Sequence, residues 1–315
     1  MRIVFMGTPD FAVPALRILV ENGYSVVGVI TAPDKAAGRG LKTKISAVKA
    51  YAQSQNLNIL QPTNLKNPDF LMELAALKAD LQVVVAFRML PEAVWNMPPK
   101  GTFNLHASLL PKYRGAAPIH HAIINGEKES GLTTFFLRHE IDTGPIILQE
   151  KMPIGADENV GSLHDRMAEK GANLVLQSTA LIAAGEVTPK TQESSVDTPC
   201  PKAPKLTKAN TQIDWSKSLN ELHNFIRGLS PFPTAWTKLE GKPFKIYKAT
   251  KEAATHNEPI GHLIIDKKDK KLMVSVKGGF LHLERIQKAG KKQMDGAAFV
   301  NGYATKEGKT ILPFS

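Results

Sequence analysis

The sequence has almost no cysteine and no long apolar run. Its 315 residues include one cysteine, Cys200, so an internal disulfide is excluded. Cys200 stands between two prolines, with neither a second sulfur nor a histidine nearby, and we interpret it as a bystander. No apolar segment approaches the roughly 18 to 20 residues that a membrane-spanning helix needs. Arg2 leads directly into Ile3 without the layout of a signal peptide, so we expect a cytoplasmic protein.

The glycine patterns of common nucleotide-binding folds are also missing. After the first apolar run the chain reads Gly7-Thr8-Pro9-Asp10, with proline where the second glycine of G-x-G-x-x-G would approach a pyrophosphate. We therefore expect no nicotinamide or other nucleotide cofactor, and Asp34 is interpreted as a turn residue rather than a ribose-binding acid. There is no P-loop, and no residue set indicates a metal site.

Negative charge is scarce in the second part of the chain. The net charge is +11, with 40 Lys and Arg against 29 Asp and Glu. Residues 1–190 hold 19 basic and 17 acidic residues, whereas residues 191–315 hold 21 and 12. Nearly all of the excess therefore lies in the second part, which predicts an anionic partner for that part.

The first part of the chain alternates short apolar runs with amphipathic stretches. This pattern predicts α/β structure, a Rossmann-like, mostly parallel sheet in a domain over residues 1–188. Strands are expected over residues 3–6, 26–30, 81–86, 102–105, 132–137 and 146–151, and helices over 13–21, 68–78, 119–124 and 162–184, with Asn67 as the cap of the second helix.

The composition then changes. Residues 189–206 contain four prolines among Thr, Ser and Lys, which is typical of a linker. Residues 207–315 carry brief β-type runs separated by turn signals, and we expect a small, basic, OB-like β-barrel there. A helix is expected over residues 219–227, and strands over 235–239, 244–247, 261–265, 272–276 and 280–286.

Two polar residues mark the end of the strand expected over residues 102–105. Strand alternation places Asn104 and His106 on one face, at the carboxyl end where open α/β sheets bind their ligands. Asp142 lies on a loop between two predicted strands, although Asp142-Thr143-Gly144 could equally be a plain turn. Without a nucleophilic cysteine or a G-x-S-x-G serine, this set suits direct acyl transfer to an acceptor amine.

A second candidate is the stretch over residues 34–44, in which Gly38-Arg39-Gly40 lies among lysines. A solvated surface loop is the ordinary interpretation; the alternative is an arm that closes on a polyanion.

The segment Asn104-Leu105-His106-Ala107-Ser108-Leu109-Leu110-Pro111, with Tyr113-Arg114-Gly115 and the later Asp142-Thr143-Gly144, resembles the 10-formyltetrahydrofolate-dependent formyltransferases. The remaining similarity is to those members of the family that act on methionyl-tRNA, and it lies in residues 5–11, 33–40, 114–119, 213–215 and 226–236. Residues 86–91 depart from the family pattern, being one residue shorter and lacking its glycine.

The resemblance implies an enzyme that uses 10-formyltetrahydrofolate as formyl donor, with Asn104, His106 and Asp142 as catalytic residues and initiator methionyl-tRNA as partner, in translation initiation. Asn104 and a protonated His106 would stabilise the oxyanion, and Asp142 would favour the charged imidazolium. It implies folate contacts from Phe87, Arg88, Met89, Leu90, Ser108, Leu109, Leu110 and Pro111, and tRNA contacts from Arg39, Lys42 and Lys44.

Two alternatives remain. One is a folate-dependent formyltransferase or formyltetrahydrofolate hydrolase that uses a small acceptor or water. The other is a non-catalytic RNA-binding protein on a transferase fold. We also expect the chain to be a monomer without a membrane partner.

Overall fold

In the computed structural model the chain forms two compact units. The structure describes residues 1–37, 42–192, 200–303 and 308–314. The first unit comprises Met1–Gly115, Ser130–Met152 and His164–Lys202, and the second comprises Ala116–Glu129, Pro153–Leu163 and Ala203–Ser315. The sequence-based division into residues 1–188, 189–206 and 207–315 stays a prediction.

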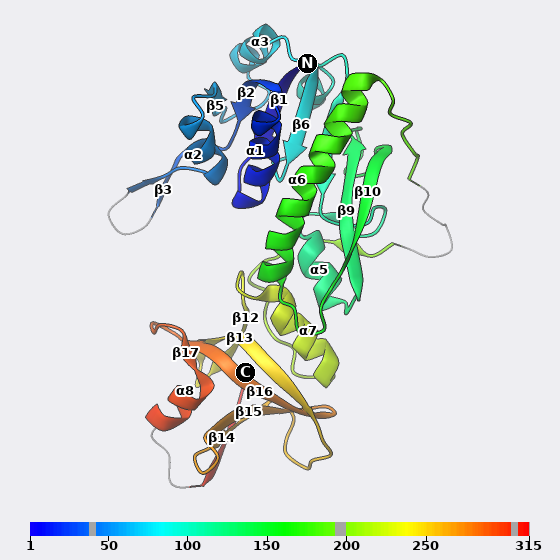
Figure 1. Ribbon diagram of the computed structural model, residues 1–315. Helices are drawn as coiled ribbons and strands as arrows, with labels where there is room; N and C mark the ends of the chain where they lie inside the picture. The colour runs from blue at the N-terminus through cyan, green and yellow to red at the C-terminus, as the bar shows by residue number, and fades with distance from the viewer. Residues whose placement is uncertain (38–41, 193–199, 304–307, 315) are drawn as a thin grey trace. The chain divides into compact units, whose positions relative to one another are not determined.

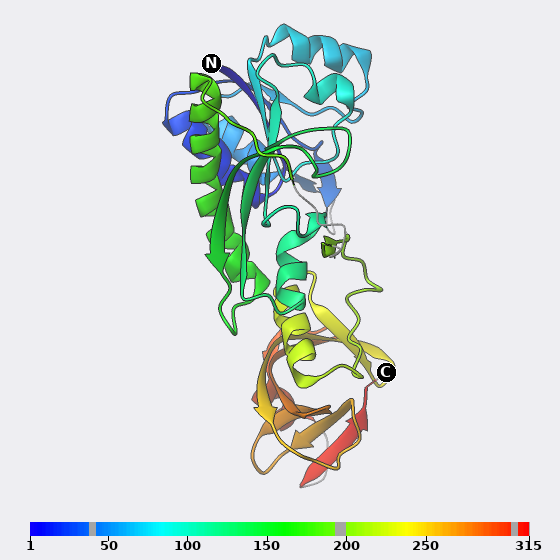
Figure 2. The same cartoon turned by 90° about the vertical axis from the view of Figure 1, so that its right-hand side faces the viewer.

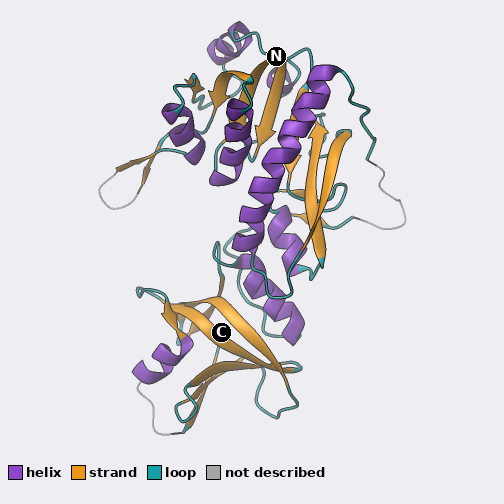
Figure 3. Ribbon diagram, viewed as in Figure 1, coloured by secondary structure: helices purple, strands orange, loops and turns teal. Residues whose placement is uncertain are grey.

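The first unit is built on a seven-stranded sheet, which confirms the predicted mostly parallel α/β fold (Figures 1 and 3). Its strand order is β10-β9-β7-β6-β1-β2-β5; β5, β2, β1, β6 and β7 run parallel, and β9 is antiparallel to β7. The strands are β1 (Arg2–Gly7), β2 (Ser25–Ile30), β5 (Ile59–Leu60), β6 (Leu81–Val85), β7 (Thr102–His106), β9 (Glu129–Phe136) and β10 (Ile146–Pro153).

Helices cover both faces of this sheet, so its central strands are apolar on both sides. On one face, Val4, Met6 and Val84 pack with Phe70 and Leu74 of α3 in one buried cluster. On the other face lie α1 and the long α6, as the two views show (Figures 1 and 2). The helices are η1 (Asp10–Ala12), α1 (Val13–Glu21), α2 (Ala47–Ser54), α3 (Pro68–Ala76), α4 (Glu92–Trp95) and α6 (Val160–Ala184).

Local signals set the ends of two of these helices where the sequence predicts them. The Asn67 side chain accepts a hydrogen bond from the Asp69 amide and caps α3, whose first residue is Pro68. Helix α1 ends at Asn22, and Gly23 follows in the left-handed region with φ of 74°.

The strand order places a topological switch point at the carboxyl ends of β1 and β6. Strand β1 leads to β2 on one side, whereas β6 pairs with β1 on the other, so the direction of winding reverses between them. Ligands of open α/β sheets bind at such a point, beside the carboxyl ends of the strands. The segments that follow β6 and β7 both start at this edge.

The second unit contains a curled antiparallel sheet, which confirms the predicted barrel-like C-terminal fold. Its order is β12-β13-β16-β15-β14-β18, and β17 pairs with β16. An isolated bridge between Leu239 and Phe314 joins the two edges. Phe244 fills the interior, with its ring against those of Phe299 and Phe314. The strands are β12 (Ala235–Leu239), β13 (Lys242–Ala253), β14 (His262–Asp266), β15 (Lys271–Val276), β16 (Gly279–Lys288), β17 (Met294–Asp295) and β18 (Lys309–Pro313).

Helices α5 (Pro118–Ile124), α7 (Leu219–Leu229) and α8 (Gly296–Gly302) complete the second unit. Ser218 and Glu221 form a capping box at the start of α7. Helices α7 and α5 approach closely at Gly228, where a Cβ would lie 2.7 Å from the Ile124 side chain. None of the helices within the described residues is long and apolar enough to cross a membrane.

Candidate active site

Asn104 and His106 project from one face of β7 at its carboxyl end. Asn104 is flanked by Val84 of β6 and Phe135 of β9, and its side chain is half-buried. Among the described residues, the Asn104 carboxamide has no hydrogen-bond partner within the protein. Its two N–H donors are therefore free for a ligand.

The His106 ring is fixed by its two neighbours. Nε2 lies 2.9 Å from the carbonyl oxygen of Tyr113, and the ring meets Phe135 edge-on at 6.5 Å between centroids. Because a carbonyl only accepts, Nε2 carries a hydrogen and donates it. The side chain is 7% exposed. The other nitrogen, Nδ1, is therefore the one at which a proton can be gained or lost.

The nitrogen Nδ1 faces Asp142. Asp142 Oδ2 lies 3.9 Å from it, close enough for a charge interaction when the imidazole is protonated but too long for a direct hydrogen bond. The same carboxylate oxygen accepts a hydrogen bond of 2.9 Å from the Gly115 amide. The structure thus brings together three residues separated by up to 38 positions in the sequence.

The loop that carries Asp142 is held in an unusual backbone conformation. Asp142 has φ of 56°, in the left-handed region that non-glycine residues seldom adopt. Gln192 donates from Nε2 to the carbonyl oxygens of Asp142 and Gly144, at 2.9 and 2.8 Å. Sequence reasoning missed Gln192 because it lies in the segment interpreted as linker. No local pattern marks it, and only the folded chain brings it to Asp142.

The loop after β7 is stabilised by buried hydroxyls. Ser108 is fully buried and donates from Oγ to the Lys112 carbonyl. Thr133 donates to the Ser108 carbonyl, and Gln149 donates to both Thr133 and the Leu110 carbonyl. The Leu110 side chain belongs to a buried cluster with Phe135 and Ile146, whereas Leu109 and Pro111 are half-buried. Their proposed contacts with folate stay predictions.

The segment after β6 begins with Ala86 in the left-handed region, at φ of 49°. Phe87 and Leu90 pack against the core of the first unit. Arg88 donates to the carbonyls of Pro62 and Thr63, and burial lowers the pKa of its guanidinium. Met89 is 73% exposed, and Ile141 beside Asp142 is 58% exposed. The segment after β6 and the loop that carries Asp142 thus each present an exposed apolar side chain.

The predicted basic arm is a hairpin of β3 (Lys35–Ala37) and β4 (Lys42–Lys44). Asp34 anchors its base, accepting from Lys49 and Gln61, and these hydrogen bonds hold the pKa of Asp34 below its usual value. Lys42 pairs through its backbone with Ala37, and Lys44 is exposed. Arg39 lies outside the described residues.

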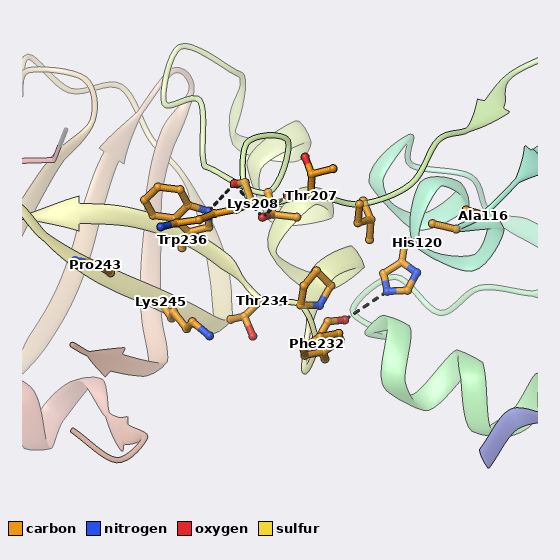
Figure 4. Close-up of a pocket in the computed structure, with 13 residues that line it drawn as sticks. Ala116, His120, Thr207, Lys208, Phe232, Thr234, Trp236, Pro243 and Lys245 are labelled. Carbon is orange, nitrogen blue, oxygen red and sulfur yellow. Dashed lines mark hydrogen bonds between the residues drawn. The ribbon is translucent and has the colours of Figure 1, made fainter. Parts of the chain in front are cut away.

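A pocket of about 650 Å³ lies wholly within the second unit (Figure 4). His120 contacts the Phe232 carbonyl from one side, and the Trp236 indole donates to the Lys208 carbonyl from another. The Lys208 ammonium lies 5.4 Å from the centroid of the Trp236 ring. The Phe232 ring is 79% exposed and Lys245 also lines the pocket. The pocket therefore combines exposed aromatic surface with positive charge.

Sequence comparison identifies the family. Residues 1–179 match the formyl transferase family, and residues 205–304 match the formyl transferase C-terminal domain. The chain belongs to the formyl transferase family. It is 53% identical to the methionyl-tRNA formyltransferase of Parabacteroides distasonis over 311 residues, covering 96% of each chain. It is 52% identical to that of Porphyromonas gingivalis strain W83 over 314 residues, again covering 96% of each chain.

Solved structures share the fold of this formyl transferase. An N-formyltransferase from Helicobacter canadensis, in complex with folinic acid and dTDP-3-aminofucose, matches with a TM-score of 0.67 and 23% identity, over 91% of this chain and 98% of that one. HypX from Aquifex aeolicus, in complex with tetrahydrofolic acid, matches with a TM-score of 0.63 and 18% identity, over 98% of this chain and 50% of that one.

The arrangement at the end of β7 suits acyl transfer without a covalent intermediate. The Asn104 carboxamide and a protonated His106 imidazole are groups that can donate to a developing oxyanion, and the Asp142 carboxylate lies beside the imidazole. The carboxyl edge of the sheet and hydrogen bonds to main-chain carbonyls and amides position the site, which favours proximity and orientation effects in catalysis.

We predict that Gly144→Ala lowers the free energy of unfolding. A Cβ at position 144 would lie 1.6 Å from the Phe136 carbonyl oxygen, so the loop must move away from β9. Overpacking of this kind typically costs about 1 to 3 kcal/mol. Urea unfolding of the variant measures the cost, and Gly302→Ala is the control because no atom of the described residues lies within 4 Å of its Cβ position. Equal midpoints for the two variants would contradict the prediction.

Proposed function

We propose that this formyl transferase moves the formyl group of 10-formyltetrahydrofolate to the α-amino group of methionine on initiator methionyl-tRNA. The observation that carries the proposal is identity of about one half over nearly the whole chain to methionyl-tRNA formyltransferases, basic second part included. The two solved neighbours described above are too distant in sequence to indicate an acceptor.

The reaction needs charge stabilisation at one oxygen. The amine attacks the formyl carbon, a carbon–nitrogen bond forms, and the formyl oxygen becomes an oxyanion. Asn104 donates to this oxygen through its free carboxamide, and His106 donates through a protonated Nδ1. Each such donor, oriented beforehand, typically contributes about 2.7 to 4 kcal/mol to transition-state stabilisation. Collapse breaks the bond to the folate nitrogen, which takes up the proton that the amine gives up.

Asp142 acts through charge and proton transfer. Its carboxylate, 3.9 Å from Nδ1 of His106, stabilises the imidazolium that donates to the oxyanion. It also moves the proton from the attacking amine to the leaving folate nitrogen, directly or through a water. The Gly115 amide holds Oδ2 in place for both roles.

The folate lies at the carboxyl edge of the sheet, against residues 86–91, 108–111 and 139–142. The exposed Met89 and Ile141 side chains support this position because a bound pterin would cover them. The fully buried Ser108 hydroxyl is already paired, so residues 108–111 contribute main-chain groups and the half-buried Leu109 and Pro111.

The second unit holds the tRNA. Residues 203–315, which form most of this unit, carry 20 Lys and Arg against 10 Asp and Glu, which suits a phosphate backbone. In the pocket of that unit, Lys208 and Lys245 are placed to contact phosphates, and Phe232 offers a ring on which a base can stack. Lys42 and Lys44 of the hairpin, together with Arg39, contact the acceptor end. We further propose that the protein is a monomer and works in the cytoplasm. Sedimentation can test the oligomeric state, and cell fractionation can test the location.

The direct test is an assay of formyl transfer. The purified protein is incubated with 10-formyltetrahydrofolate and either charged initiator tRNA, a small amine such as glycinamide ribonucleotide, or buffer alone. We expect formylmethionyl-tRNA only in the first mixture. Formylation of the small amine would instead support a formyltransferase with a small acceptor, and release of formate in buffer would support a formyltetrahydrofolate hydrolase. No reaction in any mixture would favour a non-catalytic RNA-binding protein.

Substitution of the proposed catalytic residues should lower kcat with little change in KM. We expect Asn104→Ala to lose about 10²- to 10³-fold in kcat, the usual cost of one oxyanion donor. Asp142→Asn keeps the shape but removes the charge beside His106, and we expect a loss of at least tenfold at pH 7.5. Glu186→Gln, an exposed carboxylate change in the same unit, serves as control. An unchanged rate for Asp142→Asn would contradict both of its roles.

Binding of tRNA should depend on salt and on the pocket lysines. We expect Lys208→Ala and Lys245→Ala each to raise the tRNA KM and to reduce the slope of log KM against log salt by about one. The KM for folate should stay constant. Lys268→Ala, an exposed lysine in the turn between β14 and β15, is the matched control. Equal effects on the KM for tRNA and the KM for folate would contradict the proposal that these lysines bind tRNA and not folate.

A further inference from the structure

Gln192 joins the Asp142 loop to the segment after β7. Its Oε1 accepts from Nη2 and Nε of Arg114 at 2.6 and 3.2 Å. Its Nε2 donates to the carbonyl oxygens of Asp142 and Gly144. Arginine only donates and carbonyls only accept, so the orientation of the amide is fixed without ambiguity. All four hydrogen bonds lie within the first unit.

Gln192 holds a backbone that would otherwise relax. Asp142 adopts a left-handed φ of 56°, which is unfavourable for a residue other than glycine and persists only where surrounding contacts impose it. Two neighbouring carbonyls, those of Asp142 and Gly144, point at one Nε2 group. Next to them, Ile146 and Lys190 exchange two backbone hydrogen bonds of 2.7 and 2.8 Å. The segment leading to Gln192 is therefore docked along the loop.

Two anchors define where the Asp142 carboxylate lies. Gly115 holds its Oδ2, and Gln192 holds its main chain. Arg114, which orients Gln192, immediately precedes Gly115. Gly115 therefore holds the side chain of Asp142, and its neighbour Arg114 holds the main chain of Asp142 through Gln192. Tyr113, the residue before Arg114, fixes Nε2 of His106 through its carbonyl.

We propose that Gln192 is a positioning residue for formyl transfer, which sets the distance and direction of the Asp142 carboxylate relative to Nδ1 of His106. This inference rests on the proposed function for its kinetic consequence. The residue does not touch either substrate; it acts through Asp142. A displacement of about 1 Å at a reacting group can cost on the order of 10²-fold in rate.

The kinetic test uses two variants of the full chain. Gln192→Glu keeps the acceptor for Arg114 but replaces the two donors with an oxygen that faces two carbonyls. Gln192→Met removes all four hydrogen bonds without adding charge. We expect kcat to fall about 10- to 100-fold in both, with each KM within about twofold of wild type. Gln177→Glu, the same change at an exposed position of α6, should leave the rate unchanged.

A double-mutant cycle separates this role from a general structural one. If Gln192 acts through Asp142, then Gln192→Glu should cost less than about twofold when Asp142→Asn is already present. A full additional loss in that background, or a loss confined to KM, would overturn the proposal.

A substrate-independent measurement keeps the proposal separate from the choice of acceptor. Hydrogen–deuterium exchange of the peptide covering residues 137–145 should be faster in Gln192→Met than in wild type, by at least about tenfold, and unchanged in Gln177→Glu. Equal exchange in all three proteins would overturn the positioning role even if tRNA formylation is found. Faster exchange in a protein that fails to formylate tRNA would leave the positioning role intact and overturn only the acceptor.

Discussion

The hydrogen bond between Nε2 of His106 and the Tyr113 carbonyl is the constraint on which the site depends. It fixes the rotation of the imidazole and occupies Nε2 in a hydrogen bond within the protein. Proton transfer at this ring therefore takes place at Nδ1. The Tyr113 backbone itself lies in the left-handed region, at φ of 60°. Its amide is held by the Pro201 carbonyl at 2.6 Å. A distant part of the chain thereby fixes the histidine.

Strained backbone recurs in the segments that follow β6, β7 and β9. Ala86 after β6, Tyr113 after β7 and Asp142 after β9 all have positive φ, although none is glycine. Each such residue costs about 1 to 3 kcal/mol, and the rigid sheet with its buried strands must supply that energy. Rigid loops at these positions suit a site whose groups must be oriented before the substrate binds. A flexible loop would have to be ordered during the reaction, and the entropy lost would raise the activation barrier.

The elements with strong periodic signals were predictable from the sequence. Helix α1 begins and ends at the predicted residues, and Asn67 caps α3 as its spacing indicates. Helix α2 was missed because it is eight residues long and buries only Val48 and Ala52, and α8 because its short run contains two glycines. Strand β18 was missed as well, since its register comes from pairing with β14 across a long sequence separation. In such elements the intrinsic propensity of the residues has little influence on secondary structure, which depends mostly on pairing with distant parts of the chain.

The candidate site divides in the same way. Asn104 and His106 share a strand, so alternation alone places them on one face. Asp142 could be named from its motif, but its approach to Nδ1 depends on Gly115 and Gln192, which belong to segments 27 and 50 positions away. A proline-rich composition made residues 189–206 look like a passive connection. Polar main-chain groups of a strained loop must nevertheless be satisfied by something. A segment that returns past the site is well placed to do so, and local composition carries no information about that return.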